Sequence, residues 1–166
     1  MLRAWLVVCL GFELLFVAAP GAKAADAPAE PRSVPAFELH DHLGAKHRLD
    51  EYADKQAVVI AFLGTECPLA KLYGPRLAEL AAEFEPRGIA FLGINSNQQD
   101  TLAEIGHYAR ETKIAFPLLK DPGNRVADEF GARRTPEVFV LGPDRQVLYH
   151  GRIDDQYGVG YSRPGP

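Results

Sequence analysis

The chain has 166 residues, of which 47% are hydrophobic and 24% charged, and its formal net charge is −4. This length and composition predict one globular domain, and the acidic balance gives no electrostatic support for binding nucleic acid. Two cysteines are too few for a disulfide-rich scaffold, and no cluster of Cys and His has the spacing of zinc ligands, so we expect no metal and no cofactor.

The first segment of the chain has the order of a signal peptide. A basic start at Arg3 precedes an apolar run over residues 4–19, and residues 22–24 (Ala-Lys-Ala) supply a small-residue cleavage motif. We therefore expect cleavage after Ala24 and export to the periplasm or the medium. The alternative is an uncleaved N-terminal anchor, but the carboxylate of Glu13 inside the apolar run argues against a permanent membrane anchor.

Removal of residues 1–24 would also remove Cys9 and leave Cys67 as the lone cysteine. A cysteine without a partner in an exported protein raises the question of what it reacts with. Residues 25–35 are rich in Ala and Pro and are typical of an extended linker. We assign the remaining residues, 36–166, to one domain.

After the linker, the hydrophobic pattern predicts a hairpin followed by alternating strands and helices. Continuous apolar runs are typical of buried strands, and apolar residues at three- and four-residue steps are typical of helices. The predicted strands are a hairpin around 37–49, then 57–63, 89–94, 116–119, 137–141 and a hairpin partner at 146–150. The predicted helices are 68–87 with a kink or break at Gly74-Pro75, 101–112 capped by Asp100, and a short helix ending at Phe130, capped by Asn124 and closed by Gly131. This order indicates an α/β fold with a mainly parallel sheet and an antiparallel pair of strands at the end.

Cys67 follows the buried strand 57–63 and directly precedes a helix that begins at Pro68. Reactive groups of open α/β sheets gather at the carboxyl ends of strands. A helix N-terminus favours a thiolate over a thiol, and the thiolate is the nucleophile. This placement predicts a reactive thiol; the alternative is an inert buried cysteine.

Residues 133–137 (Arg-Arg-Thr-Pro-Glu) lead into the strand 137–141. The Thr135-Pro136 bond at a strand entry is compatible with a cis peptide and equally with a trans one. Either Arg133 or Arg134 could approach Cys67 across this loop, and the alternative is that both are solvated.

Together these features resemble those of a known protein family. Residues 62–70 (Phe-Leu-Gly-Thr-Glu-Cys-Pro-Leu-Ala) resemble the active-site strand, loop and helix of redoxins, which include peroxiredoxins and exported thiol–disulfide oxidoreductases of the cytochrome-maturation type. Thr135-Pro136 is similar to their cis-proline loop, and residues 36–49 to their opening hairpin. The resemblance spans 34–154 and implies a thioredoxin-like fold, in which helices flank a central mixed sheet.

The resemblance also implies roles for single residues. Cys67 would attack the substrate, with Thr65 as a hydrogen-bond donor to the thiolate and Arg134 stabilising its charge. Pro136 would shape the substrate groove. Three further residues are expected to contact substrate: Pro68, Thr135 and Asn95. For Asn95, which follows a buried strand, the alternative is ordinary loop polarity.

Two departures from the family define the expected mechanism. Thioredoxin-like oxidoreductases carry a second cysteine three residues after the first, and here that position is Ala70, so no intramolecular dithiol is available. Thr65 lies two residues before Cys67, whereas peroxiredoxins place the threonine three before. We expect an exported oxidoreductase whose single cysteine attacks peroxide or disulfide and needs an external thiol or partner protein. The alternatives are a non-catalytic thioredoxin-fold binding module and a fragment of a longer redoxin protein.

Two other regions complete the expectations. Redoxins usually close one face of the sheet with a C-terminal helix, but no helical pattern follows residue 150, so we expect a homodimer partner or a downstream domain to cover that face. The histidines of the first hairpin (His40, His42 and His47) are expected to be solvated. A copper site of the copper-chaperone type is disfavoured, because Lys71 stands where that branch has its second cysteine.

Overall fold

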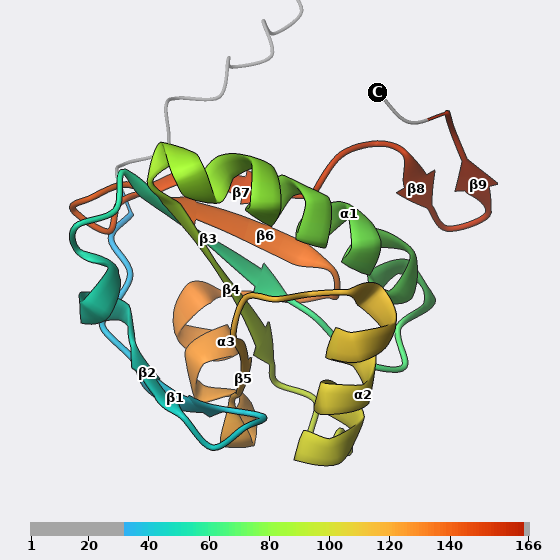
Figure 1. Ribbon diagram of the computed structural model, residues 1–166, viewed down its shortest axis with the longest axis horizontal. Coiled ribbons are helices and arrows are strands. Elements are labelled where there is room, and N and C mark those ends of the chain that lie inside the picture. Colours follow the sequence, from blue (N-terminus) through green and yellow to red (C-terminus); the bar gives the residue numbers. More distant parts are fainter. Residues whose placement is uncertain (1–31, 165–166) are drawn as a thin grey trace, which may run out of the picture.

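The computed structural model describes residues 32–164. The expected signal peptide, its cleavage site after Ala24 and Cys9 lie outside the described residues. The centre of the fold is a seven-stranded mixed sheet of order β2-β1-β5-β4-β3-β6-β7 (Figure 1). Its strands are β1 (Glu38–Asp41), β2 (Lys46–Arg48), β3 (Ala57–Phe62), β4 (Ile89–Asn95), β5 (Leu118–Lys120), β6 (Glu137–Leu141) and β7 (Val147–Gly151).

The antiparallel pair predicted at the end is confirmed as β6 and β7, but the rest of the sheet is less parallel than predicted. β3 pairs in parallel with β4, and β4 with β5. The pairs β1–β2, β1–β5, β3–β6 and β6–β7 are antiparallel. A buried strand has a continuous apolar run in either direction, so the pattern located β6 but did not reveal its direction.

Helices cover both faces of the sheet. They are α1 (Pro68–Phe84), α2 (Leu102–Thr112) and α3 (Arg125–Phe130), with 3-10 turns at Leu49–Tyr52, Glu85–Arg87 and Pro122–Asn124. Alternate residues of β3 point to opposite faces. Val59 and Ala61 belong to the core under α1 and α2, while Ile60 and Phe62 belong to the core under α3. The described elements have a thioredoxin-like arrangement.

α1 continues through Gly74-Pro75, so the predicted break is wrong, while the predicted kink stays a prediction. A Cβ added to Gly74 would lie 2.3 Å from Cγ2 of Thr112 on α2 and 3.0 Å from the hydroxyl of Tyr108. The glycine therefore permits close packing of α1 against α2. Pro75 has no backbone N–H, so the helix loses one hydrogen bond there. Burial of α1 against the sheet and α2 keeps the helix intact.

The N-caps of two helices also differ from prediction. Thr101, not Asp100, caps α2: its hydroxyl accepts from Glu104 N at 3.3 Å, and the Glu104 carboxylate accepts from Thr101 N at 2.7 Å. Asn124 is the N-cap residue of α3, but its side chain makes no capping hydrogen bond. The buried carboxylate of Asp121 takes that role, because it accepts from the first helical amides of α3.

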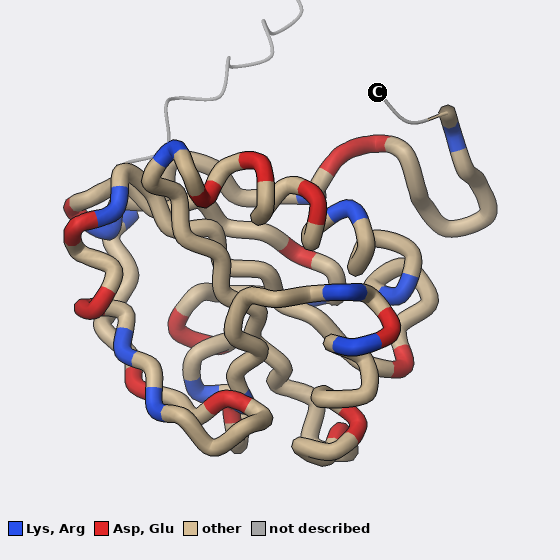
Figure 2. The backbone as a smooth tube through the Cα atoms, in the orientation of Figure 1, with Lys and Arg blue, Asp and Glu red and all other residues tan. Residues whose placement is uncertain are grey.

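The chain after β7 forms a second, two-stranded sheet of β8 (Tyr157–Gly158) and β9 (Tyr161–Ser162) beside α1, and no helix follows β7 within the described residues (Figure 1). Next to it, the sheet face under α1 carries an apolar groove of about 280 Å³. The groove lining includes Val59, Leu77, Leu80, Phe84, Val138, Val140 and Tyr149. Figure 2 shows acidic and basic residues interspersed over the fold.

The first hairpin corrects the prediction of solvated histidines at two positions, and at the first of them His42 is half-buried with its Nδ1 shielded from solvent. His47 is not solvated: its Nε2 lies 3.0 Å from Asp41 Oδ2 and its Nδ1 lies 3.3 Å from the Tyr52 hydroxyl. Asp41 is buried and also accepts the N–H groups of Leu43 and Ala45, so the histidine joins a local network that closes the turn. The residues that the structure describes hold no group of three potential metal ligands and no helix long and apolar enough to cross a membrane.

Candidate active site around Cys67

Cys67 is the N-cap residue of α1, directly after the loop that leaves β3. Its side chain is half-buried, and its thiol donates to the carbonyl oxygen of Thr135 at 3.1 Å. Pro68 occupies the first helical position beside it and is exposed. Cys67 thus lies at the N-terminus of α1, where the N–H groups of the first turn have no acceptor within the helix.

The Thr135-Pro136 segment lies against Cys67, and its peptide bond is cis. Both residues line a cavity of about 230 Å³ together with Leu69 in the first turn of α1. Thr135 also lines a second cavity of about 240 Å³ on the other side of the loop. The structure therefore brings Cys67, Pro68, Thr135 and Pro136 together, and their roles toward a substrate stay predictions.

Thr65 is buried two residues before Cys67, and its backbone N–H donates to Asp100 Oδ2 at 2.9 Å. Among residues 32–164, no hydrogen bond joins its hydroxyl to the Cys67 sulfur. Its expected role as a donor to the thiolate therefore stays a prediction. The structure shows instead that the hydrogen bond from Thr65 N to Asp100 holds the loop before Cys67 in place.

Asp100 is a buried carboxylate that organises the loops around the site. Besides Thr65 N, its Oδ2 accepts from Asn95 Nδ2 at 2.6 Å and from Asn97 Nδ2 at 3.2 Å. Burial works to raise the pKa of Asp100, but these hydrogen bonds outweigh it and hold the pKa below its usual value. A charged Asp100 thus joins the loop before Cys67 to the end of β4.

Asn95 ends β4 near the site, but its amide belongs to this network. Its Nδ2 donates to Asp100, and its Oδ1 accepts from Lys120 Nζ at 3.2 Å. Asn97, which sequence reasoning missed, lines the 240 Å³ cavity together with its neighbour Ser96. A Cβ on Gly64 would lie 2.6 Å from Asn97 Nδ2, so a side chain at Gly64 would displace the Asn97 amide where the two loops meet.

Arg134 is exposed, and its side chain lies near the carboxylate of Glu137. Its Nε is 3.9 Å from Oε1 of Glu137, and it lines both cavities that flank Thr135. Within the described part of the chain, no hydrogen bond or ion pair joins Arg134 to Cys67. Its stabilising role toward the thiolate stays a prediction.

Glu137 is a second residue beside the site that sequence reasoning missed. It is buried at the start of β6, and its Oε2 accepts the backbone N–H of Arg133 at 2.7 Å and of Arg134 at 3.4 Å. Its Oε1 lies 2.8 Å from His150 Nε2. Burial works to raise the pKa of Glu137, but the N–H of Arg133 and the His150 ring outweigh it and lower the pKa. This carboxylate holds the segment that leads to Thr135.

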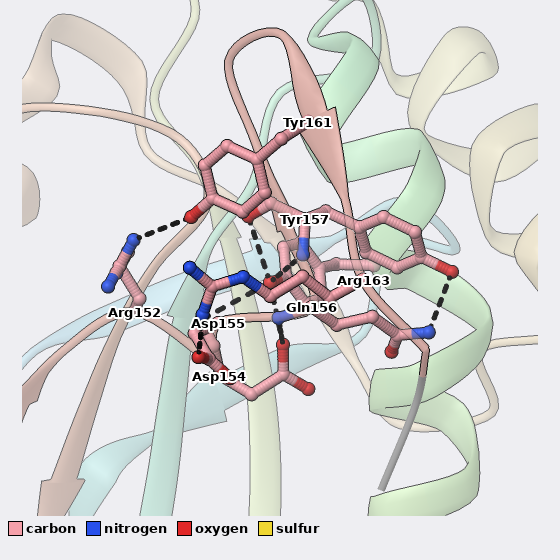
Figure 3. A network of polar contacts seen from close by, with 8 residues as sticks. Arg152, Asp154, Asp155, Gln156, Tyr157, Tyr161 and Arg163 are labelled. Atoms are coloured by element: carbon pink, nitrogen blue, oxygen red, sulfur yellow. Dashed lines mark hydrogen bonds and ion pairs between the residues drawn. The ribbon is translucent and has the colours of Figure 1, made fainter.

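The C-terminal segment is tied to α1 by Tyr73. The Tyr73 hydroxyl donates to Asp154 Oδ1 at 2.7 Å and accepts from Tyr157 N at 3.0 Å, and the two tyrosine rings meet edge to face at 5.0 Å. Burial and the hydrogen bond to Asp154 raise the pKa of Tyr73 to about 12. Figure 3 shows the polar contacts that hold this segment together, including Arg152 Nη1 to the Tyr161 hydroxyl at 3.1 Å.

Comparisons with known proteins agree with this geometry. The AhpC/TSA family matches residues 32–150. Thiol-disulfide oxidoreductase ResA of Halalkalibacterium halodurans is 25% identical over 112 residues, which are 68% of this chain and 62% of that protein. The 1-Cys peroxiredoxin PER1 of Triticum aestivum is 25% identical over 131 residues, covering 69% of this chain and 60% of that protein. This chain thus spans a little under two thirds of these curated relatives.

Solved structures give the same fold. A hypothetical protein of Sinorhizobium meliloti has a TM-score of 0.75 and 31% identity, over 82% of this chain and 78% of that one. An uncharacterized conserved protein of Geobacillus kaustophilus has a TM-score of 0.77 and 29% identity, over 82% and 75%. Peroxidoxin BcpB of Mycobacterium tuberculosis has a TM-score of 0.62 and 27% identity, over 71% and 81%.

Proposed function

We propose that this chain, which belongs to the AhpC/TSA family, is a thiol–disulfide oxidoreductase that works with the single cysteine Cys67. The observation that carries the proposal is the position of its thiol. Cys67 is the N-cap residue of α1, its side chain is half-buried, and its thiol donates to the Thr135 carbonyl. The similarity to thiol-disulfide oxidoreductases supports the same chemistry.

The reaction proceeds in two exchanges. The Cys67 thiolate attacks one sulfur of a substrate disulfide, an S–S bond forms to Cys67, and the other substrate sulfur leaves as a thiolate. An external thiolate then attacks this mixed disulfide, releases Cys67 as a thiolate, and leaves with the first substrate sulfur in a new disulfide. One external thiol is oxidised for each substrate thiol released, so the electrons balance.

The external thiol is needed because of the residues around Cys67. Ala70 occupies the position of a resolving cysteine, and Cys67 is the one free cysteine among the residues that the structure describes. The reductant is therefore a small thiol or a partner protein. Such a partner would approach over Pro68 and Thr135, which border Cys67, with Pro136 shaping the groove and Arg134 and Thr65 acting on the thiolate.

Peroxide reduction is a second candidate, and it is favoured by the similarity to a 1-Cys peroxiredoxin and to a peroxidoxin. In that reaction, the thiolate attacks one peroxide oxygen, the O–O bond breaks, and the second oxygen leaves as an alcohol or water. The Cys67 sulfenic acid then condenses with one external thiol, releasing water. A second thiol restores the thiolate.

Export and assembly complete the proposal. The signal-peptide pattern of residues 1–24 supports a place in the periplasm or outside the cell. The apolar groove beneath α1 supports a homodimer or a downstream domain over that sheet face. Sedimentation velocity of the expressed chain tests the homodimer, since a concentration-independent monomer would exclude it.

A turnover assay tests the central part of the proposal. Reduced protein is mixed with glutathione and either 2-hydroxyethyl disulfide or hydrogen peroxide, and consumption is followed for wild type and Cys67→Ser. We expect turnover of the disulfide that the substitution abolishes while the circular dichroism spectrum is retained. Equal rates with both proteins would overturn the proposal and favour a binding module without turnover.

A further inference from the structure

The C-terminal hairpin forms one wall of the cavity beside Cys67. We call this wall the tail wall and define it by Tyr157, Gly158, Val159 and Tyr161. The opposite wall contains Leu69 and the Thr135-Pro136 segment, and the cavity between them measures about 230 Å³. Cys67 itself does not line the cavity, but Leu69 lies two residues after it and the Thr135 carbonyl accepts its thiol, so residues next to the reacting sulfur form this wall.

The tail wall has a fixed position against α1. Tyr73, which is buried on α1, hydrogen-bonds both to Tyr157 N and to the Asp154 carboxylate. Asp154 also accepts the N–H of Gln156 at 2.8 Å, which shapes the turn into β8. Val159 follows at the tip of the hairpin. It lines the outer part of the cavity, and 93% of its surface is exposed.

The size of the cavity points to part of a larger ligand. Sites that enclose a whole drug-sized ligand measure about 300–1,000 Å³, and this cavity is smaller. It suits one or two side chains of a chain segment that continues past it. Hydrogen peroxide or a minimal disulfide would leave the cavity largely unfilled.

The lining has a clear chemical character. Leu69, Ile153 and Val159 are aliphatic, and three tyrosines add aromatic surface. The two charged residues of the lining, Arg134 and Arg152, are both basic, and no carboxylate belongs to it. An apolar side chain with an acidic neighbour would therefore meet complementary surfaces on both walls.

We propose that this cavity selects protein disulfides in which the residue next to the attacked cysteine is apolar and is followed by an acidic residue. The inference rests on the proposed function and names its substrate class. Attack by the Cys67 thiolate forms a mixed disulfide with that cysteine and releases the other substrate sulfur as a thiolate. The apolar side chain lies between Leu69 and Val159, and the acidic one lies near Arg152.

Peptide disulfides of matched sequence provide the test. The first probe is an octapeptide with the central sequence Cys-Leu-Glu, its cysteine in a mixed disulfide with 2-mercaptoethanol. A second probe has Cys-Ser-Lys in the same frame, and 2-hydroxyethyl disulfide is the reference. Each peptide's rate constant is divided by the rate constant of the same protein with 2-hydroxyethyl disulfide. For wild type, we expect this relative rate to be roughly tenfold higher with the Leu-Glu peptide than with the Ser-Lys peptide.

Substitutions locate the selectivity. Val159→Asp and Arg152→Glu both change exposed side chains of the cavity, and each is expected to reduce the Leu-Glu to Ser-Lys rate ratio toward one. The matched control is Leu43→Asp, which changes an apolar residue of similar exposure in the first hairpin and should leave the ratio unchanged. Equal rates for the two peptides, or a ratio that these substitutions do not change, would overturn the proposal. Absence of exchange with every disulfide would instead contradict the proposed function.

Discussion

The carboxylate of Glu137 lies 2.8 Å from the Nε2 of His150 and accepts the backbone N–H of Arg133 with its other oxygen. One buried charge therefore connects β7 to the segment that carries Thr135. The His150 ring is itself stacked on Phe139, with 4.1 Å between ring centroids, which fixes the donor in place. The carbonyl that contacts Cys67 depends on this arrangement.

Substitution of Glu137 is expected to affect both stability and thiol chemistry. Glu137→Ala leaves the N–H of Arg133 and the His150 ring without their acceptor, and the cost should be about 1–3 kcal/mol of unfolding free energy. Glu137→Gln keeps an acceptor and should recover part of this loss. Urea denaturation measures stability, and the rate of Cys67 alkylation reports on the site. Alkylation at the wild-type rate in both variants would contradict a link between Glu137 and the thiol.

Asp100 is expected to make the fold sensitive to acid. Because its folded pKa is lowered, its contribution to stability is present above the unfolded value of 3.8 and is lost as the pH falls through the folded pKa. Asp100→Asn should therefore destabilise the protein at pH 7 by about 1–3 kcal/mol and less at pH 3. Chemical denaturation from pH 3 to 7 checks this. The exposed Asp54→Asn is the control, and the same pH dependence of the destabilisation in both variants would contradict the assignment.

Gly64 is expected to tolerate no side chain while Asn97 is present. A Cβ at this position would lie 2.6 Å from Asn97 Nδ2 and 3.3 Å from Thr135 Oγ1. Gly64→Ala should destabilise the fold by about 1–3 kcal/mol and slow the reaction of Cys67. Adding Asn97→Ala should relieve much of the stability loss, because the nearer of the two contacts is removed. Additive effects in this double-mutant cycle would show that the two residues do not interact.

Tyr73 is expected to hold the C-terminal hairpin in place. Tyr73→Phe keeps the ring but removes the hydroxyl that contacts Asp154 and Tyr157 N. Hydrogen exchange of residues 154–163 should speed up several-fold, while the sheet amides keep wild-type rates. Tyr149→Phe is the control, because the Tyr149 hydroxyl donates to Arg152 O upstream of that segment. Unchanged exchange in Tyr73→Phe would show that ring packing alone secures the hairpin.

Much of the fold was predictable because a strand that is buried on both faces consists almost entirely of apolar residues. The strands β3, β4 and β6 lie between helices or inside the sheet, so each is a continuous apolar run that the hydrophobic pattern located. The continuity of α1 was not predictable. Gly74-Pro75 ends most isolated helices, and its acceptance here depends on Thr112 in another helix.

The site was predictable in part for a similar reason. The resemblance placed Cys67 and Thr135 on segments that meet, and the structure brings them to 3.1 Å. Glu137 and Asn97 were missed because each looks ordinary in its local context, the first as an edge of an apolar run and the second as loop polarity. Their partners, His150 and Gly64, are distant in sequence, so only the folded chain reveals the contacts.

Mass spectrometry of the trapped intermediate tests most directly whether Cys67 is the attacking thiol. Reduced protein is mixed briefly with 2-hydroxyethyl disulfide, quenched with acid and digested without reductant. The account predicts one mercaptoethanol adduct, on the peptide that contains Cys67, which glutathione removes and which Cys67→Ser does not form. An unmodified Cys67 peptide under conditions in which the disulfide is consumed would contradict the account.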